Sequence, residues 1–320
     1  MGDMRVLIIA VCLFSLLIKG TAQTKKVTNM KKEEKTIRLI YPQWQGGYIA
    51  AFIPEIKDST AASQGYALGA QLLNFLAPTS MDTYTVPVSM SPTRKVQDGV
   101  YDRDVIVEQT RAALNILKKA NPDCIVTLGG ECSVSVPPFT YLADKYDGDV
   151  AMIWIDAHPD ITLPGEAYPG FHAMAVTACL GLGDKKIINE LPKKISADKV
   201  LFVGLRDWER DEIKERQKQL GIKHLTVEEL KDNSNALMAW VKSTGVKHIL
   251  VHFDMDVLEP TEIISAVGIV KNGMRINEVV RIINDIAQNH HIVGLTIAEA
   301  MPRTAILIRD MLSRLPMIGQ

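Results

Sequence analysis

The sequence has almost no excess of charge of either sign. Lys and Arg number 36 and Asp and Glu number 37 among 320 residues, so the formal net charge at pH 7 is −1. Acidic and basic residues are interspersed, which gives no electrostatic reason to expect nucleic acid as a partner. No G-x-G-x-x-G or G-K-[ST] run occurs, so the pair Gly129-Gly130 is only a weak sign of nucleotide binding.

Long apolar runs are also scarce. The longest, residues 6–18, follows Arg5 and precedes the small residues around Ala22. It is shorter than the ~20 residues that span a bilayer. The pattern is typical of a secretory signal peptide, with an uncleaved anchor as the alternative. We predict a signal peptide over residues 1–22, a flexible polar tail over residues 23–35, and a secreted or periplasmic protein without membrane attachment after cleavage.

Cysteine is rare and uneven in number. Cys12 lies in the predicted signal peptide, which leaves Cys124, Cys132 and Cys179. Three cysteines cannot all form internal disulfides, and no disulfide framework is indicated. A free or metal-bound thiol therefore has to be considered.

What the chain does contain is a regular alternation of short apolar runs and amphipathic segments. The apolar runs begin at residues 37, 83, 124, 151, 200, 248 and 291, and residues 104–120 and 276–288 have helical periodicity. The runs are continuously apolar, as is typical of strands that are covered on both faces. This pattern predicts one α/β domain over residues 36–320 with a central, mostly parallel sheet.

Polar residues follow three of these predicted strands. Asp156, His158 and Asp160 come after one strand, Asp254 and Asp256 after another, and Gly-Gly-Glu-Cys-Ser, residues 129–133, after a third. Alternate residues of an extended chain point to the same side, so the acids of each motif can converge. Each motif alone could be an exposed turn. Together they would repel one another strongly, and a pair of divalent metal ions, such as Mn²⁺, would relieve that repulsion.

These motifs resemble the ureohydrolase family, the arginases and agmatinases. The stretches IWIDAHPD, GLRD and GLTIAEAMP carry the resemblance, which covers residues 129–302. It implies a three-layer α-β-α fold with a central, mostly parallel sheet. It also implies two Mn²⁺ ions per subunit and hydrolysis of a C–N bond in a small guanidino compound, which releases urea.

The resemblance also assigns roles to individual residues. It implies that Asp156 and Asp254 bridge the two metals and that a hydroxide between the ions is the nucleophile. His158 and Asp256 would complete one metal position, and Asp160 would belong to the other.

Two further residues match catalytic positions of the family. His172 matches a mobile histidine that shuttles protons. Glu299 matches the acid that holds the guanidinium group, for which a carboxylate is a strong bidentate partner.

Some positions depart from the family pattern. Cys132 stands where the family has a metal-binding histidine, and a thiolate is softer and favours zinc or iron over manganese. Thr162 replaces an asparagine and Glu209 an aspartate of arginases. These two changes concern the substrate and do not support arginine in particular.

Two other functions stay open. One is an amidase or deacylase with a single Zn²⁺ held by Asp156, His158 and Asp256, with His172 as the acid/base and an amide as substrate. The other is a degenerate, non-catalytic homologue that binds a small cation or a partner. A homo-oligomer is possible in each case, since family members commonly form trimers or hexamers.

Overall fold

The structure, a computed structural model, describes residues 34–49, 53–78, 80–91, 94–315 and 317. The predicted signal peptide and residues 23–33 of the predicted tail lie outside these residues. Lys35, at the end of that tail, is held in place: its amide donates to Asp123 Oδ2 at 2.9 Å and its Nζ donates to the Ala120 carbonyl at 2.7 Å. In the described part of the chain, no helix is both long enough and apolar enough to cross a membrane.

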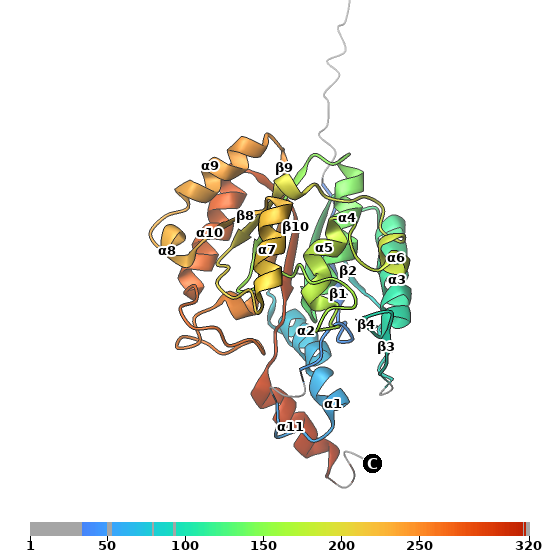
Figure 1. The fold of residues 1–320 in the computed structure, drawn as a ribbon. Coiled ribbons are helices and arrows are strands. Elements are labelled where there is room, and N and C mark those ends of the chain that lie inside the picture. The colour runs from blue at the N-terminus through green and yellow to red at the C-terminus, as the bar shows by residue number, and fades with distance from the viewer. Residues whose placement is uncertain (1–33, 50–52, 79, 92–93, 316, 318–320) are drawn as a thin grey trace, which may run out of the picture. The chain divides into compact units, whose positions relative to one another are not determined.

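One parallel sheet of eight strands organises the described residues (Figure 1). Every neighbouring pair of its strands is parallel. The strands, in their order across the sheet, are β2 (Thr83–Thr85), β1 (Thr36–Tyr41), β5 (Cys124–Gly129), β10 (His291–Ala298), β9 (His248–Asp254), β6 (Val150–Ile155), β7 (Val200–Val203) and β8 (Lys223–Leu225). The predicted parallel sheet is confirmed, and all seven predicted strands lie in it.

The remaining elements are mostly helices. A separate antiparallel pair consists of β3 (Val96–Gln97) and β4 (Val100–Tyr101). The α-helices are α1 (Ser59–Ser63), α2 (Gly65–Leu76), α3 (Arg103–Ala120), α4 (Val136–Lys145), α5 (Ala175–Cys179), α6 (Lys185–Ile188), α7 (Asp211–Leu220), α8 (Val227–Leu230), α9 (Asn235–Thr244), α10 (Ile276–Asn289) and α11 (Arg303–Ser313). Short 3-10 helices are η2 (Cys132–Ser135), η3 (His172–Met174), η4 (Ala197–Lys199) and η5 (Met255–Val257). The helices predicted over 104–120 and 276–288 are α3 and α10.

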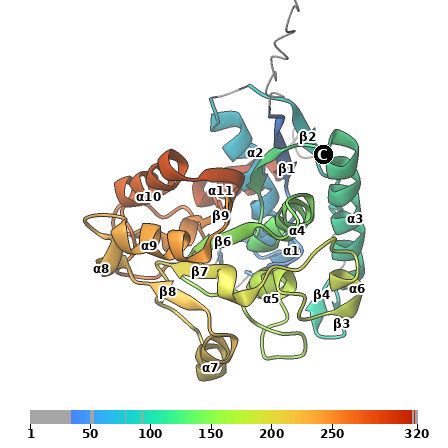
Figure 2. The same cartoon turned by 90° about the horizontal axis from the view of Figure 1, so that it is seen from above.

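Helices cover both faces of the sheet, because its strands alternate apolar side chains between two cores. Trp154 of β6 faces the core that contains Leu117 of α3, whereas Ile153 faces the core that contains Ile282 of α10. Figure 2 shows α3 to α6 on one side of the sheet and α8 to α10 on the other. This is the three-layer α-β-α arrangement expected above, and it explains why the strands are apolar on both sides.

The carboxyl ends of β5, β10, β9 and β6 lie next to one another in the middle of the sheet. Asp254 at the end of β9 is in register with Ala298 at the end of β10, and Ile155 of β6 is in register with Phe253. The residues that follow these strands therefore start side by side. In open α/β sheets this edge is where ligands bind.

Candidate functional site

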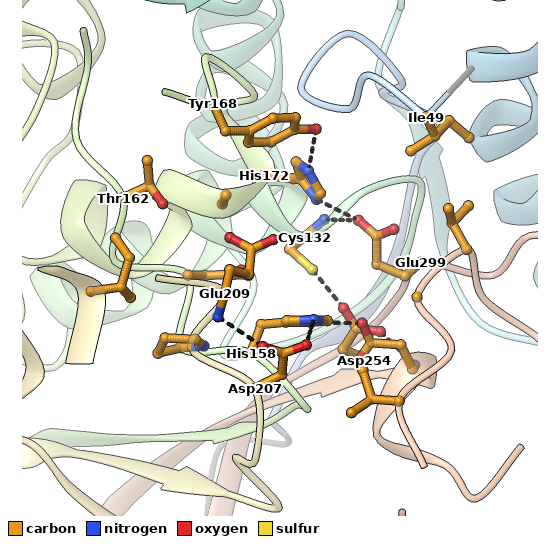
Figure 3. Close-up of a pocket in the computed structure, with 18 of the residues that line it drawn as sticks. Ile49, Cys132, His158, Thr162, Tyr168, His172, Asp207, Glu209, Asp254 and Glu299 are labelled. Carbon is orange, nitrogen blue, oxygen red and sulfur yellow. Dashed lines mark hydrogen bonds and ion pairs between the residues drawn. The ribbon is translucent and has the colours of Figure 1, made fainter. Parts of the chain in front are cut away.

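A pocket of about 360 Å³ opens at this edge of the sheet (Figure 3). Nine of the ten predicted site residues line it: Cys132, His158, Asp160, Thr162, His172, Glu209, Asp254, Asp256 and Glu299. The tenth, Asp156, is buried next to His158. The fold thus brings every predicted site residue to one place.

Two groups of side chains in and below the pocket have the composition of metal sites. The outer ligand group is Asp156, His158 and Asp256. The inner ligand group is Cys132, Asp156, His252 and Asp254. In each group, one potential ligand atom per residue lies within 4.8 Å of all the others. Asp156 belongs to both groups, as expected of a bridging ligand.

Tight turns after the strands position the outer ligand group. The Asp156 carboxylate accepts from the His158 amide at 2.6 Å and from Trp154 Nε1 at 2.9 Å. Asp256 accepts from the Ala157 amide at 3.2 Å, and its Oδ2 lies 2.9 Å from His158 Nδ1. The acids converge because they bind backbone N–H groups of these turns, not because an extended chain alternates as the sequence pattern had indicated.

The inner ligand group is fully buried. The Cys132 thiol donates to Asp254 Oδ2 at 2.9 Å, and Asp254 Oδ1 accepts from the Asp256 amide at 2.6 Å. Cys132 begins η2, one residue after the Gly129-Gly130 pair, with Glu131 between them. A Cβ at Gly130 would lie 1.8 Å from the Gln43 carbonyl oxygen, so the glycine permits a close approach of two backbones.

Asp160 lies in the pocket wall with a left-handed backbone, φ 49°. Its carboxylate is buried, and Oδ2 has no hydrogen-bond partner in the described part of the chain. It belongs to neither ligand group among the described residues. An acceptor left unpaired at this depth fits a site that a cation completes.

The charges of the site are also arranged for a cation. Burial, followed by repulsion from Asp256, raises the pKa of Asp156 to about 7. Burial and neighbouring carboxylates also raise the pKa values of Asp160, Asp254 and the Cys132 thiol well above their ordinary values. Divalent ions would favour the ionised forms, so the residues fit metal binding.

Asp256 behaves differently from the other acids. Burial alone would raise its pKa, but attraction to His158 lowers it to about 2. Burial likewise works against the charged form of His158, but Asp256 raises the His158 pKa well above its ordinary value. Without metal, these two residues form an ion pair in the outer ligand group.

A second histidine and a glutamate lie on the other side of the pocket. His172 Nδ1 lies 3.3 Å from Glu299 Oε1, and the Tyr168 hydroxyl lies 2.7 Å from His172 Nε2 (Figure 3). Burial alone would lower the pKa of His172, but attraction to Tyr168 and Glu299 raises it well above its ordinary value. His172 is therefore suited to hold a proton at neutral pH.

Glu299 is held firmly. Its backbone has φ 62°, which is unusual for a residue other than glycine, and its amide donates to the Gly130 carbonyl at 2.7 Å. Its carboxylate is buried and accepts from the Cys132 amide at 3.1 Å.

Thr162 and Glu209 lie at different depths. Thr162 is buried, and its hydroxyl accepts from Arg210 at 3.5 Å. The Glu209 side chain is 45% exposed and lies 3.7 Å from Arg210. Glu209 can therefore meet the outer end of a bound molecule.

Polar residues of the site that the sequence did not reveal include Tyr168, Asp207 and His252. Tyr168 is four residues before His172, but nothing in the sequence marked that pair. Asp207 Oδ2 lies 3.9 Å from His158 Nε2. His252 had a detectable signal, because it precedes Asp254 by two residues in a strand and so points to the same face.

The model of the arginase family matches residues 62–308, which include the whole site. The chain belongs to the arginase family. Family members typically bind a binuclear metal centre, and the buried ligand cluster of this chain is consistent with one.

Curated arginases are similar in sequence. The arginase of Saccharomyces cerevisiae is 27% identical over 227 residues, which are 65% of this chain and 67% of that protein. The arginase of Eremothecium gossypii is 27% identical over 189 residues, which are 56% of this chain and 47% of that protein. The latter match thus spans about half of the relative's length.

Solved arginases share the fold. The arginase of Entamoeba histolytica in complex with L-ornithine has a TM-score of 0.68 at 17% identity, covering 86% of this chain and 95% of that one. The arginase of Bacillus caldovelox has a TM-score of 0.64 at 19% identity, covering 88% and 98%. The expected arginase-like fold is confirmed.

Proposed function

We propose that this protein hydrolyses a C–N bond of a small guanidino compound and releases urea, with two divalent metal ions per chain. The observation that carries the proposal is the buried Glu299 carboxylate. It lies in a pocket of about 360 Å³ that also holds residues of both ligand groups. A planar guanidinium cation is the natural partner of such a carboxylate.

The ligand groups determine where metals would bind. Asp156, His158 and Asp256 would hold one ion, and Cys132, Asp156 and Asp254 would hold the other. Bound divalent ions would neutralise the gathered carboxylates and activate a water for attack on the guanidino carbon. This proposal has two versions. In one, Mn²⁺ occupies both positions, as the resemblance implies; in the other, a softer ion occupies the position that contains Cys132.

The chain's own residues would orient the substrate and move protons. Glu299 would bind the guanidinium group, and His172 would deliver a proton from its ring to the leaving nitrogen. The Tyr168 hydroxyl would keep the His172 ring in position through its 2.7 Å contact with Nε2. Thr162 and the partly exposed Glu209 would contact the far end of the substrate, where specificity among guanidino compounds is decided.

One observation favours a second function. The outer ligand group forms a complete Asp-His-Asp set without Cys132. A single Zn²⁺ bound there would support an amidase or deacylase with His172 as the acid/base. Metal content separates the two: two ions per chain support urea release, and one zinc supports the amidase.

The decisive experiment measures urea release from a panel of guanidino compounds by protein with a determined metal content. In a Glu299→Gln variant we expect kcat/KM to fall about 100-fold, because the charge facing the guanidinium is lost. The matched control, Glu209→Gln at the pocket rim, should change the preference among substrates and leave the best rate within about fivefold. Urea release that Glu299→Gln leaves unchanged would refute the proposal.

We also propose that residues 1–22 direct export and that the mature protein is secreted or periplasmic. The support is the sequence pattern alone. N-terminal sequencing of the protein from its native cell tests the proposal: a mature terminus near residue 23 is expected, and an intact Met1 would contradict it. Homo-oligomer formation, which the resemblance suggests, is tested by the mass of the purified protein in solution.

A further inference from the structure

His252 is the one inner-group residue to which the family resemblance assigns no role. It is fully buried in β9, with 0% exposure. One of its ring nitrogens lies within 4.8 Å of a ligand atom of each of Cys132, Asp156 and Asp254. Among the described residues, its Nε2 has no hydrogen-bond partner. An unpartnered nitrogen on a buried ring that lies beside a thiol and two carboxylates needs an explanation.

The ring is held in one orientation by its neighbours. It stacks on Trp154, with ring centroids 3.6 Å apart and an angle of 10° between the planes. The Ser135 hydroxyl lies 2.8 Å from Nδ1. Histidines that bind metals through one nitrogen almost always have the other in such a hydrogen bond, which sets the tautomer and the ring orientation. With Nδ1 taken by Ser135, Nε2 is the nitrogen that is free to bind.

Apart from His252, the inner ligand group contains no nitrogen donor. The resemblance places Cys132 where the family has a metal-binding histidine, so His252 is the remaining candidate for a nitrogen ligand in this group. A cysteine is smaller than a histidine, and the imidazole of His252 lies beside it. We propose that His252 is a metal ligand of the inner position through Nε2, with Cys132 as the thiolate ligand of the same ion. This inference rests on the metal centre of the proposed function.

The resulting donor set is one sulfur, one nitrogen and the oxygens of Asp156 and Asp254. Four such donors suit a tetrahedral site for zinc or cobalt, whose bond lengths of ~2.0–2.3 Å bring ligand atoms to ~3.3–3.7 Å of one another. The Cys132 Sγ to Asp254 Oδ2 distance of 2.9 Å is already that short. The other atoms lie within 4.8 Å of one another and would need to close by at most about 1.5 Å.

A purely structural role for His252 is the competing explanation. Thr296 and Thr127 are in register with His252 across β10 and β5, and their hydroxyls also lack hydrogen-bond partners. His252 could simply belong to this buried polar row. Thr296→Val is therefore the matched control, because it removes a buried polar group of the row without touching the ligand group.

The experiment titrates the metal-free protein with Co²⁺ and measures ions bound per chain, the thiolate-to-cobalt absorption band and affinity by competition with a chelator. Wild type should bind two ions and show the band. His252→Phe retains a ring to stack on Trp154. It should keep one ion at wild-type affinity and bind the other at least 100-fold more weakly, since even outer-shell changes cost ~10–100-fold. Thr296→Val should bind as wild type does.

The outcomes separate the inference from the proposed function. Wild-type affinity for both ions in His252→Phe, or an equal loss in Thr296→Val, would overturn the role of His252 and leave the enzyme proposal intact. A wild-type protein that binds no ions would end both. A second measurement needs no variant: Co²⁺-loaded wild type with ¹⁵N-labelled histidine should show a paramagnetically shifted, slowly exchanging Nδ1–H signal from the buried ring. Its absence would overturn the inference even if His252→Phe fails to fold.

Discussion

The outer and inner ligand groups share Asp156 but differ in burial and in the partner of their second aspartate. The outer group has a histidine that is 21% exposed and paired with Asp256 at 2.9 Å. The inner group is entirely buried and has a thiol in place of a charged partner. Burial lowers the pKa of His252 to about 3, so its ring is neutral.

This difference explains what stabilises the ionised carboxylates in each ligand group. In the outer group His158 provides a positive charge, so Asp256 stays ionised without a metal. In the inner group Asp254 accepts from the Cys132 thiol and the Asp256 amide, which carry no positive charge, and Asp156 shares His158 with Asp256. Burial therefore favours the protonated acids of this group unless a metal is bound. In the outer group the ligand Asp256 is thus already ionised before a metal binds. In the inner group the acids become fully ionised only with the ion.

The largest expected effect comes from removing a charge of the outer group. Asp256→Asn should lower kcat/KM at least ~1000-fold, because it replaces a carboxylate beside His158 Nδ1 with a weaker ligand. Urea assays measure the rate, and circular dichroism checks the fold. Asp207→Asn is the control, since this 43% exposed carboxylate lies 3.9 Å from His158, and it should cost less than about tenfold. Wild-type turnover in Asp256→Asn would remove the outer group from the reaction.

The next effect concerns stability without metal. The folded pKa of Asp156 is raised to about 7, and that of Asp254 is raised well above its usual value. A raised carboxyl pKa stabilises the fold fully below the unfolded pKa of ~4, and this stabilisation declines up to the folded pKa. The free energy of unfolding of the metal-free protein should therefore fall by a few kcal/mol between about pH 4 and 7.

Urea denaturation of metal-free protein at several pH values tests this expectation, with Zn²⁺- or Mn²⁺-loaded protein as the control. The loaded protein should show little decline, because the ions favour the ionised acids. Asp256, whose pKa is lowered to about 2, acts in the opposite direction and only below about pH 4. Stability of the metal-free form that stays constant from pH 4 to 7 would contradict the contrast between the two groups.

A smaller effect is expected on metal preference. Cys132→Ser keeps the size of the side chain but removes the soft donor of the inner group, so the ratio of Zn²⁺ to Mn²⁺ affinity should fall about tenfold. Chelator competition measures both affinities. Cys179→Ser, another buried cysteine but one away from the pocket, is the matched control and should leave the ratio unchanged. An unchanged ratio in Cys132→Ser would mean that the thiol is not a ligand.

The smallest effect concerns the residue that positions His172. Tyr168→Phe should lower kcat by about three- to tenfold, since the 2.7 Å contact with Nε2 is lost. Tyr168 raises the pKa of His172, so its removal lowers that pKa. The alkaline limb of the pH–rate profile should therefore move to lower pH. Tyr48→Phe, on the same pocket wall, should leave the profile in place, and an unmoved limb in Tyr168→Phe would show that His172 is not the proton donor.

Much of the site could be predicted because it follows from local sequence. Asp156 comes directly after β6 and Asp254 is the last residue of β9, and the apolar runs of both strands are plain in the sequence. Parallel strands end at the same edge, so the acids had to be near one another. Thr162 and Glu209 were assigned through the resemblance alone, and the structure places both in the pocket at different depths.

Other features could not be predicted, because the local sequence does not mark them. β8 is short and carries Lys223 and His224, so no apolar run marked it. The Tyr168–His172 contact depends on the course of a loop. Glu299 meets Cys132 across 167 residues of sequence only because β10 lies beside β5.

The sequence by itself determined the parallel sheet, the covered faces and the identity of most candidate metal-binding side chains, since apolar periodicity and strand-end polarity are local properties. Only the tertiary structure decided which of these side chains lie close enough to share an ion. It placed His252 between Trp154 of the neighbouring strand and Ser135 of η2, with Nε2 unbonded among the described residues and one ring nitrogen within 4.8 Å of ligand atoms of Cys132, Asp156 and Asp254. The physical reason is that a ligand set is a matter of distances between strands, which pairing order fixes and sequence spacing does not.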